Sequence, residues 1–216
     1  KDTFYKRAKA VSTLRAILDE AGYTEVETPT LQNIPGGASA RPFITHFNAL
    51  NQQMYCRIAT ELYLKRLIVG GFEGVYEIGK NFRNEGMDKN HNPEFTCMEL
   101  YVQYKDYNWM MSFTESLLER ICIAVNGSAE TVIDGKTISF KAPYRRLPIL
   151  EAIREKTGYD LSDKNEDEIR AICKELKMEI DETMGKGKLI DEIFGEFCEG
   201  TFIQPTFITD YPIEMS

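Results

Sequence analysis

Hydrophobic residues recur with helical spacing in several parts of the chain. Between positions 4 and 21 they return every three or four residues, which predicts an amphipathic helix. The same spacing predicts helices over 61–71, preceded by Thr60 as a candidate N-cap, and over 108–125. From 144 to 200 it continues among many Glu and Lys residues, which predicts a helical insertion with a solvated, charged face.

Apolar and polar residues alternate between these segments, as they do in strands with one buried face. The segment 131–140 indicates a hairpin, because Asp134-Gly135 is a strong turn signal. Further strands are predicted at 23–31, 54–58, 74–85, 95–102 and 201–212. This order of elements predicts an α+β fold, in which an antiparallel sheet is flanked by helices.

The composition is that of an ordinary folded chain, with 216 residues, 43% of them hydrophobic and 28% charged. No apolar run approaches the roughly 20 residues that span a bilayer, and the first helix lacks the apolar centre of a signal peptide. We therefore expect a cytoplasmic protein without a membrane segment. A net charge of -8 argues against a protein that coats nucleic acid, and it leaves open a local RNA contact through one loop.

The cysteines and histidines do not form a metal-binding pattern. The chain has five cysteines, an odd number without a Cys-x-x-Cys pair, and only two histidines. This argues against a structural zinc site and against a disulfide framework. We expect reduced, mostly buried thiols and no metal ligands within this chain.

The segment 81–104 concentrates side chains that a strand pair does not need for packing. One face of its second strand carries Phe95, Glu99 and Tyr101. One face of the strand predicted at 74–85 carries Glu77, Arg83 and Glu85. An arginine fork suits a carboxylate or a phosphate, and a neighbouring aromatic ring offers a stacking surface. These residues indicate an anion-binding cleft. The alternative is the plain solvent-facing side of an antiparallel sheet.

This segment resembles the signature of a known family. "FRNEG" and "HNPEFTCMELY" are similar to the second motif of class II aminoacyl-tRNA synthetases, in the form found in bacterial lysyl-tRNA synthetases. "GYTEVETPTL" resembles the first motif, and the similarity continues from 34 to 86. The resemblance implies the class II catalytic fold, with ATP, L-lysine and the acceptor end of tRNA(Lys) as partners.

The resemblance also implies roles for residues of the second motif. Arg83 would bind the α-phosphate of ATP and the lysine carboxylate, which makes it the candidate catalytic residue. Glu85 would contact the adenine amino group, His91 the terminal phosphate, and Phe95 would stack under the purine. The loop 86–92 would lie near the acceptor end of tRNA.

Four further positions match the family's lysine pocket. Glu61 and the backbone at Gly37 would receive the α-ammonium group of lysine, while Glu99 and Tyr101 would orient the substrate and its ε-ammonium group. One more position, Pro29 of the first motif, would lie at the interface of a homodimer.

Several of these residues also have a plainer explanation when taken singly. Glu61 could complement the dipole of a helix N-terminus, and Gly37 could belong to an ordinary turn. His91 could be a simple loop residue, and Tyr101 a half-buried strand tyrosine. The functional interpretation depends on their joint match to one pattern.

Parts of the family's pattern have no counterpart in the sequence. We find neither a third class motif, with its second arginine, nor an anticodon-binding OB-fold domain. We therefore interpret 1–216 as part of a catalytic domain, roughly its first two-thirds. We expect the Mg²⁺ ligands to lie beyond its end, and the chain alone to form little or no adenylate.

Two other functions stay open at this point. One is a ligase that attaches a lysine-type residue to an elongation factor and shares "FRNE" and "HNPEFT" with the tRNA enzymes. The other is a non-catalytic module that dimerises and binds partners through a synthetase-like surface.

A different pattern, G-x-x-x-x-G-K at 74–80, begins like a phosphate-binding P-loop. Asn81 stands where a P-loop has a magnesium-binding Ser or Thr, and the residues between the glycines favour a strand. We reject this segment as a nucleotide site.

Overall fold

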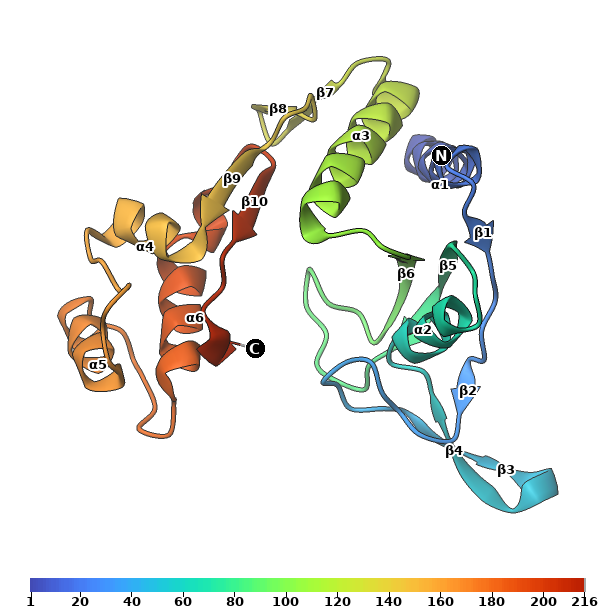
Figure 1. The fold of residues 1–216 in the computed structure, drawn as a ribbon, viewed down its shortest axis with the longest axis horizontal. Coiled ribbons are helices and arrows are strands. Elements are labelled where there is room, and N and C mark those ends of the chain that lie inside the picture. Colours follow the sequence, from blue (N-terminus) through green and yellow to red (C-terminus); the bar gives the residue numbers. More distant parts are fainter. Residues whose placement is uncertain (216) are drawn as a thin grey trace. The chain divides into compact units, whose positions relative to one another are not determined.

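The computed structural model describes residues 1–215, and the chain divides into two compact units, Lys1–Trp109 and Met110–Ser216 (Figure 1). The first unit contains two helices and six strands. In chain order they are α1 (Asp2–Glu20), β1 (Thr24–Glu25), β2 (Leu31–Gln32), β3 (Ile44–Phe47), β4 (Gln52–Cys56), α2 (Glu61–Val69), β5 (Gly74–Phe82) and β6 (Glu94–Val102).

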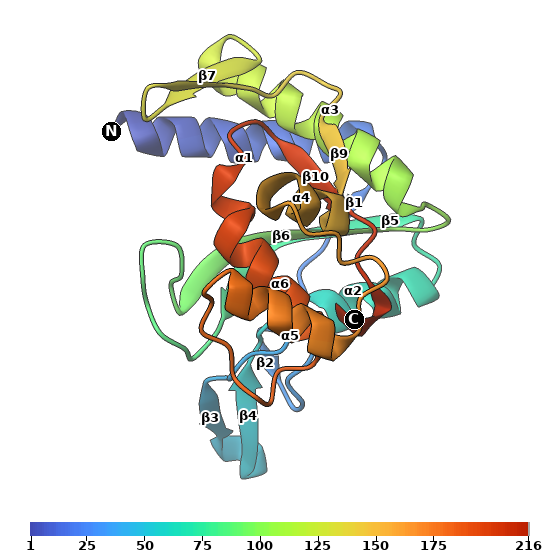
Figure 2. The same ribbon diagram turned by 90° about the vertical axis from the view of Figure 1, so that its left-hand side faces the viewer.

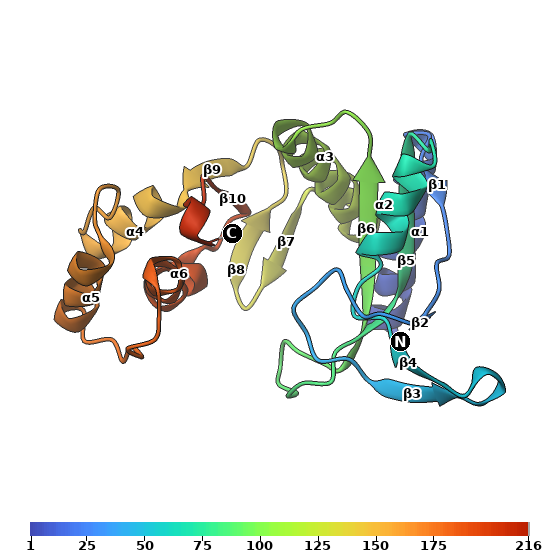
Figure 3. The same cartoon turned by 60° about the horizontal axis from the view of Figure 1, so that its bottom comes forward.

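The long β5–β6 pair is the centre of the first unit. Its strands run antiparallel, from Gly74 opposite Val102 to Phe82 opposite Glu94. Strand β1 pairs parallel with β5 at the edge, and α2 packs against both long strands (Figure 3). The other sheet of this unit has the order β2-β4-β3, and its β3–β4 hairpin extends away from β5 and β6.

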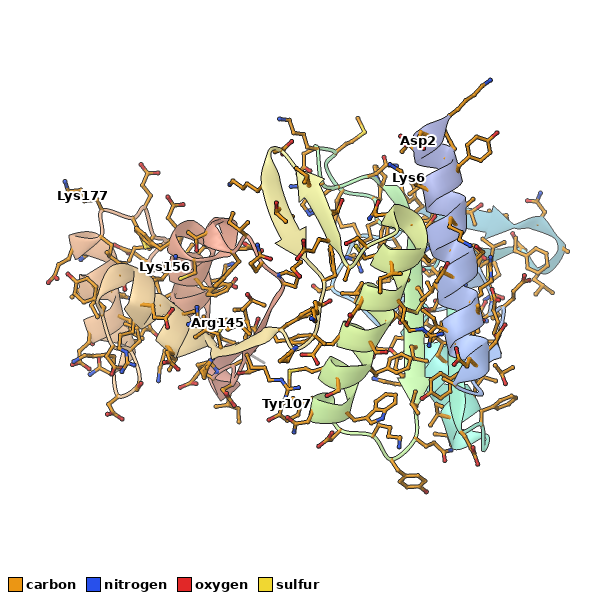
Figure 4. The ribbon with its side chains drawn as sticks, turned by 90° about the horizontal axis from the view of Figure 1, so that it is seen from above. Asp2, Lys6, Tyr107, Arg145, Lys156 and Lys177 are labelled. Carbon is orange, nitrogen blue, oxygen red and sulfur yellow. The ribbon has the colours of Figure 1, made fainter. Side chains whose placement is uncertain are left out.

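Helix α1 forms where it was predicted, but most of its apolar residues are exposed or only partly buried. Ile17 and Leu18 are buried near its C-terminal end, whereas Phe4 is 79% exposed. Asp2 and Lys6 form an exposed ion pair of 3.0 Å one turn apart, as Figure 4 shows. The contribution of α1 to the core of this unit is therefore concentrated in its last turns.

Helix α2 begins after Thr60, as predicted, but the predicted cap is wrong in its chemistry. Thr60 has helical backbone angles and makes no side-chain hydrogen bond to the helix. Its Oγ1 atom is buried without a hydrogen-bond partner among residues 1–215, and its N–H donates to Glu99 Oε1 at 3.3 Å. The start of the helix is thus fixed by β6 rather than by a cap.

The second unit begins within a long helix, which is followed by a hairpin, a strand, three shorter helices and a last strand. Its elements are α3 (Tyr107–Asn126), β7 (Glu130–Ile133), β8 (Lys136–Ser139), β9 (Arg145–Pro148), α4 (Ile149–Thr157), α5 (Glu166–Glu175), α6 (Lys186–Phe197) and β10 (Thr206–Thr209). The β7–β8 turn is the predicted one, since Asp134 and Gly135 both adopt positive φ. Strands β9 and β10 pair in parallel, and α4, α5 and α6 form the connection between them (Figure 2).

The core of the second unit is aliphatic. It is formed by buried side chains from α4, α5, α6 and the neighbouring segments. These are Leu147, Ile149, Ala152, Ile153, Leu161, Ile169, Ile172, Cys173, Leu189, Ile190, Ile193 and Cys198. Asn165 begins α5 with a complete capping box, in which its side chain and that of Glu168 bond each other's backbone N–H groups. Charged residues such as Lys156 and Lys177 remain exposed (Figure 4).

The mixture of helices and small sheets confirms the predicted α+β class, and two of the strand pairings are parallel. Three further turns are 3₁₀ helices, at Asn48–Leu50, Glu199–Thr201 and Ile213–Met215. The limits of the helical insertion, 144–200, stay a prediction. Among the described residues, no helix is both long and apolar enough to cross a membrane.

Candidate functional site

The loop that joins β5 to β6 closes a cavity at the end of the strand pair. The cavity has a volume of about 220 Å³ and lies within the first unit. Its lining is formed by Arg83, Glu85, Gly86, Asn90, His91, Asn92 and Phe95. The structure therefore brings together the four residues that the sequence predicted for nucleotide binding, and it adds two asparagines that the prediction missed.

Arg83 lies over an aromatic ring and keeps donors free. Its guanidinium carbon is 5.2 Å from the centre of the Phe95 ring, a cation–π distance. Its backbone N–H donates to the carbonyl of Pro93 at 2.8 Å, which ties the two ends of the loop together. Among the described residues its buried Nε atom has no hydrogen-bond partner. A buried donor without a partner is costly, so this fork is suited to receive an anion.

The loop has its own hydrogen-bond network around Asp88. This carboxylate accepts from the N–H groups of Asn90 and His91 at 2.7 and 2.8 Å, and Oδ2 lies 2.8 Å from His91 Nδ1. The hydrogen bond from the His91 side chain is the largest cause that lowers the pKa of Asp88. Since a carboxylate only accepts, Nδ1 carries the ring proton, and His91 Nε2 is left for another partner.

Glu85 is oriented by a different loop. Its Oε1 accepts from the N–H of Arg41 at 3.2 Å, and the N–H of Asn84 donates to the carbonyl of Arg41 at 2.7 Å. The segment between β2 and β3 thus reaches the cavity through Arg41. Arg41 is a site neighbour that the sequence reasoning missed.

A second group of predicted residues converges next to the start of α2. Gly37 adopts a φ of +88°, and a Cβ added there would lie 2.9 Å from Glu61 Cβ, so only glycine fits against this side chain. Glu99 accepts from the Thr60 N–H and from the Tyr101 hydroxyl, each at 3.3 Å. The structure therefore places the four predicted lysine-pocket residues together.

The charge of this pocket is negative, as its effect on Tyr101 shows. The pKa of Tyr101 is raised first by burial and then by the negative charges of Glu99 and Glu61. Glu61 has one cationic neighbour, Lys65, whose Nζ lies 2.6 Å from Oε1 one helical turn away. Glu61 therefore already binds an ammonium group, that of Lys65.

Cys97 connects the two groups, because it lies on β6 between Phe95 and Glu99. Its pKa is raised by burial and by the charge of Glu99, and it is lowered by the charge of Arg83. The pKa of this one thiol therefore depends on both Arg83 and Glu99. Alternate residues of a strand share a face, so the pocket and the aromatic surface lie along one side of β6.

The alternative of a plain solvent-facing side of the sheet fails at Glu77, which the alternation of β5 places on its charged face. This residue is 3% exposed and forms a buried ion pair with Arg57. Sequence reasoning missed Arg57, because an arginine inside the alternating segment 54–58 looks like an outward-facing strand residue. The signal lies in three dimensions, where both side chains are enclosed.

The P-loop-like glycines have packing explanations. A Cβ at Gly79 would lie 2.2 Å from Arg57 Nη2, and one at Gly74 would lie 2.2 Å from the Tyr23 ring. The segment forms strand β5, which confirms its rejection as a nucleotide cradle. Both glycines make room for side chains from other segments.

The remaining predictions concern Pro29, the cysteines and metal binding. Pro29 is exposed between β1 and β2, and its place in a dimer interface stays a prediction. Cys122, Cys173 and Cys198 are buried, as expected, while the remaining two cysteines are half-buried. Within residues 1–215 no group of three or more His, Cys, Asp or Glu side chains could hold a metal ion.

Comparison with known proteins agrees with this geometry. A profile of the tRNA synthetases class II (D, K and N) matches residues 1–216. The chain is 65% identical to a lysine–tRNA ligase of Porphyromonas gingivalis, 63% to one of Christiangramia forsetii and 61% to one of Azobacteroides pseudotrichonymphae, in each case over 100% of its length. It covers 37%, 38% and 43% of those proteins, so it spans about two fifths of the curated relatives it matches. The resemblance seen in the motifs is confirmed: the chain belongs to the class II tRNA synthetases of the D, K and N group.

Proposed function

We propose that the protein carrying this chain activates L-lysine with ATP and transfers it to tRNA(Lys). One observation carries the proposal: Arg83, with a buried Nε that has no partner among the described residues, lies over an aromatic ring at the same strand pair as a half-buried cluster of Glu61, Glu99 and Tyr101. The first suits a nucleotide phosphate and base, and the second suits a diamino acid. The names of the relatives, lysine–tRNA ligases, support this choice of amino acid.

The activation step joins the two halves of the site. An oxygen of the lysine carboxylate attacks the α-phosphorus of ATP, and the bond from that phosphorus to the pyrophosphate oxygen breaks. Lysyl-adenylate and pyrophosphate are the products. Arg83 neutralises the charge that builds on the α-phosphate oxygens, and a positioned donor of this kind typically contributes about 2.7–4 kcal/mol to the rate.

Lysine would be held by its two ammonium groups in the acidic pocket. The α-ammonium binds Glu61 and the backbone at Gly37, where it displaces Lys65 from Oε1. Glu99 and Tyr101 orient the chain and its ε-ammonium, with the Tyr101 hydroxyl already hydrogen-bonded to Glu99. The raised pKa of Tyr101 keeps this phenol protonated, so that it remains a donor.

The nucleotide would be held by the loop and its strand ends. Phe95 stacks under the purine, Glu85 contacts the adenine amino group, and His91 uses its Nε2 for the terminal phosphate. Mg²⁺ bound to ATP would neutralise phosphate charge. The described residues offer no cluster for this ion, so we assign it no ligand in this chain.

Transfer completes the reaction. A hydroxyl of the terminal ribose of tRNA attacks the carbonyl carbon of lysyl-adenylate, and AMP leaves. The loop 86–92, which borders the cavity, would lie near the incoming acceptor end.

We further propose that the protein works in the cytoplasm as a homodimer, with Pro29 at the interface.

Lysine-dependent exchange of pyrophosphate into ATP tests the activation step in the natural-length protein. We expect exchange with L-lysine and rejection of norleucine, which has the same length without the ε-ammonium. A pocket built for a polar group rejects such an analogue by on the order of 10⁴-fold. Equal exchange with both amino acids, or none with lysine, would contradict the proposal.

Acceptor assays then separate the remaining functions. Labelled lysine should appear on tRNA(Lys) and not on an elongation factor. Labelling of the protein acceptor alone would favour the related ligase. Binding of lysine and ATP without exchange would favour a non-catalytic module.

A further inference from the structure

Arg57 lies between the two parts of the candidate site, on the segment that leads from β4 to α2. Its side chain is 4% exposed, and that of its ion-pair partner Glu77, on β5, is 3% exposed. Such burial is unusual for a charged pair, because both groups lose their hydration. The exposed ion pairs elsewhere in the chain face no such cost.

The guanidinium of Arg57 connects three separate chain segments. Its Nε donates to the carbonyl of Lys80 on β5 at 2.8 Å, and its Nη1 donates to the carbonyl of Thr28, after β1, at 3.1 Å. Glu77 completes the arrangement, since its Oε2 accepts from the N–H and the hydroxyl of Thr28 at 3.2 and 2.6 Å. The ion pair therefore joins three chain segments, at Thr28, at Arg57 and on β5.

The backbone of Arg57 adds two more links at the same junction. Its N–H donates to the carbonyl of Thr30 at 2.8 Å, and its carbonyl accepts from the N–H of Phe82 at 2.9 Å. Phe82 directly precedes Arg83 of the nucleotide side. Three residues beyond Arg57, the Thr60 N–H donates to Glu99 of the lysine side.

The sequence makes room for this arrangement at Gly79. A Cβ at that position would lie 2.2 Å from Arg57 Nη2, a separation that no real contact allows. Gly79 is paired with Cys97 on β6, the residue whose pKa depends on both Arg83 and Glu99. The guanidinium thus lies against the strand pair between the phosphate-binding and lysine-binding groups.

A buried ion pair is weak evidence for stability, because well-packed apolar residues of similar volume often do as well. The links described here instead fix geometry. We propose that Arg57, paired with Glu77, is a positioning residue that holds the lysine side and the nucleotide side of the site in register. The inference rests on the proposed function, and its test separates the two.

Arg57→Lys in the natural-length protein is the first test. Lysine keeps the positive charge for Glu77 but lacks the planar fork, so it cannot reach Lys80 and Thr28 together. Small misplacement of reacting groups costs on the order of tenfold to a hundredfold in rate. We expect kcat/KM for lysine-dependent pyrophosphate exchange to fall by that factor, with kcat reduced and the thermal midpoint close to that of the unaltered protein.

Arg145→Lys is the matched control. Arg145 also pairs with a glutamate, Glu155, at 2.6 Å, but the two side chains are 51% and 37% exposed. Exposed pairs contribute little, so we expect exchange within about twofold of the unaltered protein. Should Arg57→Lys fail to fold, Thr28→Val replaces it, because it keeps the buried ion pair and removes the hydroxyl that donates to Glu77 at 2.6 Å.

Cys97 provides a readout that does not depend on catalysis. In a Cys56→Ser background, the rate of its modification by a thiol reagent reports the placement of Arg83 and Glu99. We expect Arg57→Lys to change this rate and Arg145→Lys to leave it unaltered. A changed rate in a protein that activates no lysine would support the positioning role while refuting the proposed function.

Two outcomes would overturn the inference. One is a variant that keeps both exchange and Cys97 reactivity like those of the unaltered protein. The other is a loss of exchange that only follows the unfolded fraction and disappears at lower temperature, since that result would show a purely structural role.

Discussion

The two units of the molecule differ in how they treat charged residues. In the first unit Arg57 and Glu77 are enclosed as an ion pair, and the buried polar residues Gln32, Thr60 and Asn81 accompany them. In the second unit the core cluster is aliphatic, and ion pairs such as Lys188 with Asp191 are 53% exposed on both sides. Its buried carboxylate, Glu115, accepts from the Tyr144 N–H at 3.0 Å and lies 4.0 Å from Arg146, which is 42% exposed. The first unit therefore encloses both members of an ion pair, while the charged partners in the second unit remain in contact with water.

Cavity size and the chemistry of the lining residues point to different units. The second unit has a larger hollow, about 560 Å³, lined by residues such as Glu179, Asp191, Glu196 and Phe197. Its carboxylates are solvated, and no buried side-chain atom without a partner lies among its lining within the described residues. The smaller cavity of about 220 Å³ contains the unpaired Arg83 Nε, which is the stronger indication of a ligand.

Replacement of the catalytic candidate should produce the largest effect. Arg83→Ala removes the fork that we propose binds the α-phosphate, so we expect exchange to fall by about 10²–10³, or about 2.7–4 kcal/mol. Steady-state exchange by the natural-length protein measures this. Arg146→Ala, an exposed arginine of the second unit, is the control. A similar loss in both variants would remove the distinction between the units.

Deletion of one buried methylene should have a smaller effect and should separate stability from activity. Ile190→Val in the second core costs about 0.5–1.5 kcal/mol, which lowers the thermal midpoint by about 2–4 °C per kcal/mol for a chain of this size. Below the transition we expect an unchanged KM for lysine. Ile58→Val, next to Arg57 in the first unit, should cost similar stability and also raise that KM. A raised KM for lysine in Ile190→Val together with an unchanged KM in Ile58→Val would contradict the comparison between the units.

The hairpin and the helices of the second unit could be predicted from sequence because their signals are local, whereas β9 (Arg145–Pro148), within the segment predicted as helical, was missed. Apolar spacing placed α5 and α6, and the turn at Asp134-Gly135 placed the β7–β8 hairpin. In the first unit local signals located the elements but not their contacts. Thr60 is of a residue type common at N-caps, yet its N–H bonds to Glu99 on β6. Glu77 occupies a position where the alternation of β5 is typical of a surface residue, yet it is buried.

The site shows the same division between local and long-range information. Arg83, Glu85, His91 and Phe95 lie within a few residues of one another, so one motif could identify them. Arg57 could not be found this way, because its partners lie about twenty to thirty positions away on β5 and after β1. Its role depends on the burial that those distant segments create.

The smallest predicted effect concerns two exposed aspartates, one in each unit. Hydrogen bonds lower the pKa of both from 3.8, chiefly from the His91 side chain for Asp88 and from the Thr183 side chain for Asp181. A lowered folded-state pKa means that each set of bonds stabilises its loop above about pH 4 and is lost as the pH falls through the folded value. NMR titration of the carboxyl groups should give both midpoints below 3.8.

Substitution of the partners sharpens this last comparison. His91→Ala should raise the midpoint of Asp88 toward 3.8 and leave Asp181 unchanged, while Thr183→Val should do the opposite. In each variant the carboxylate keeps its backbone N–H donors, so part of the lowering of its pKa should remain. A changed midpoint for the aspartate whose side-chain partner was not substituted would contradict this assignment of partners.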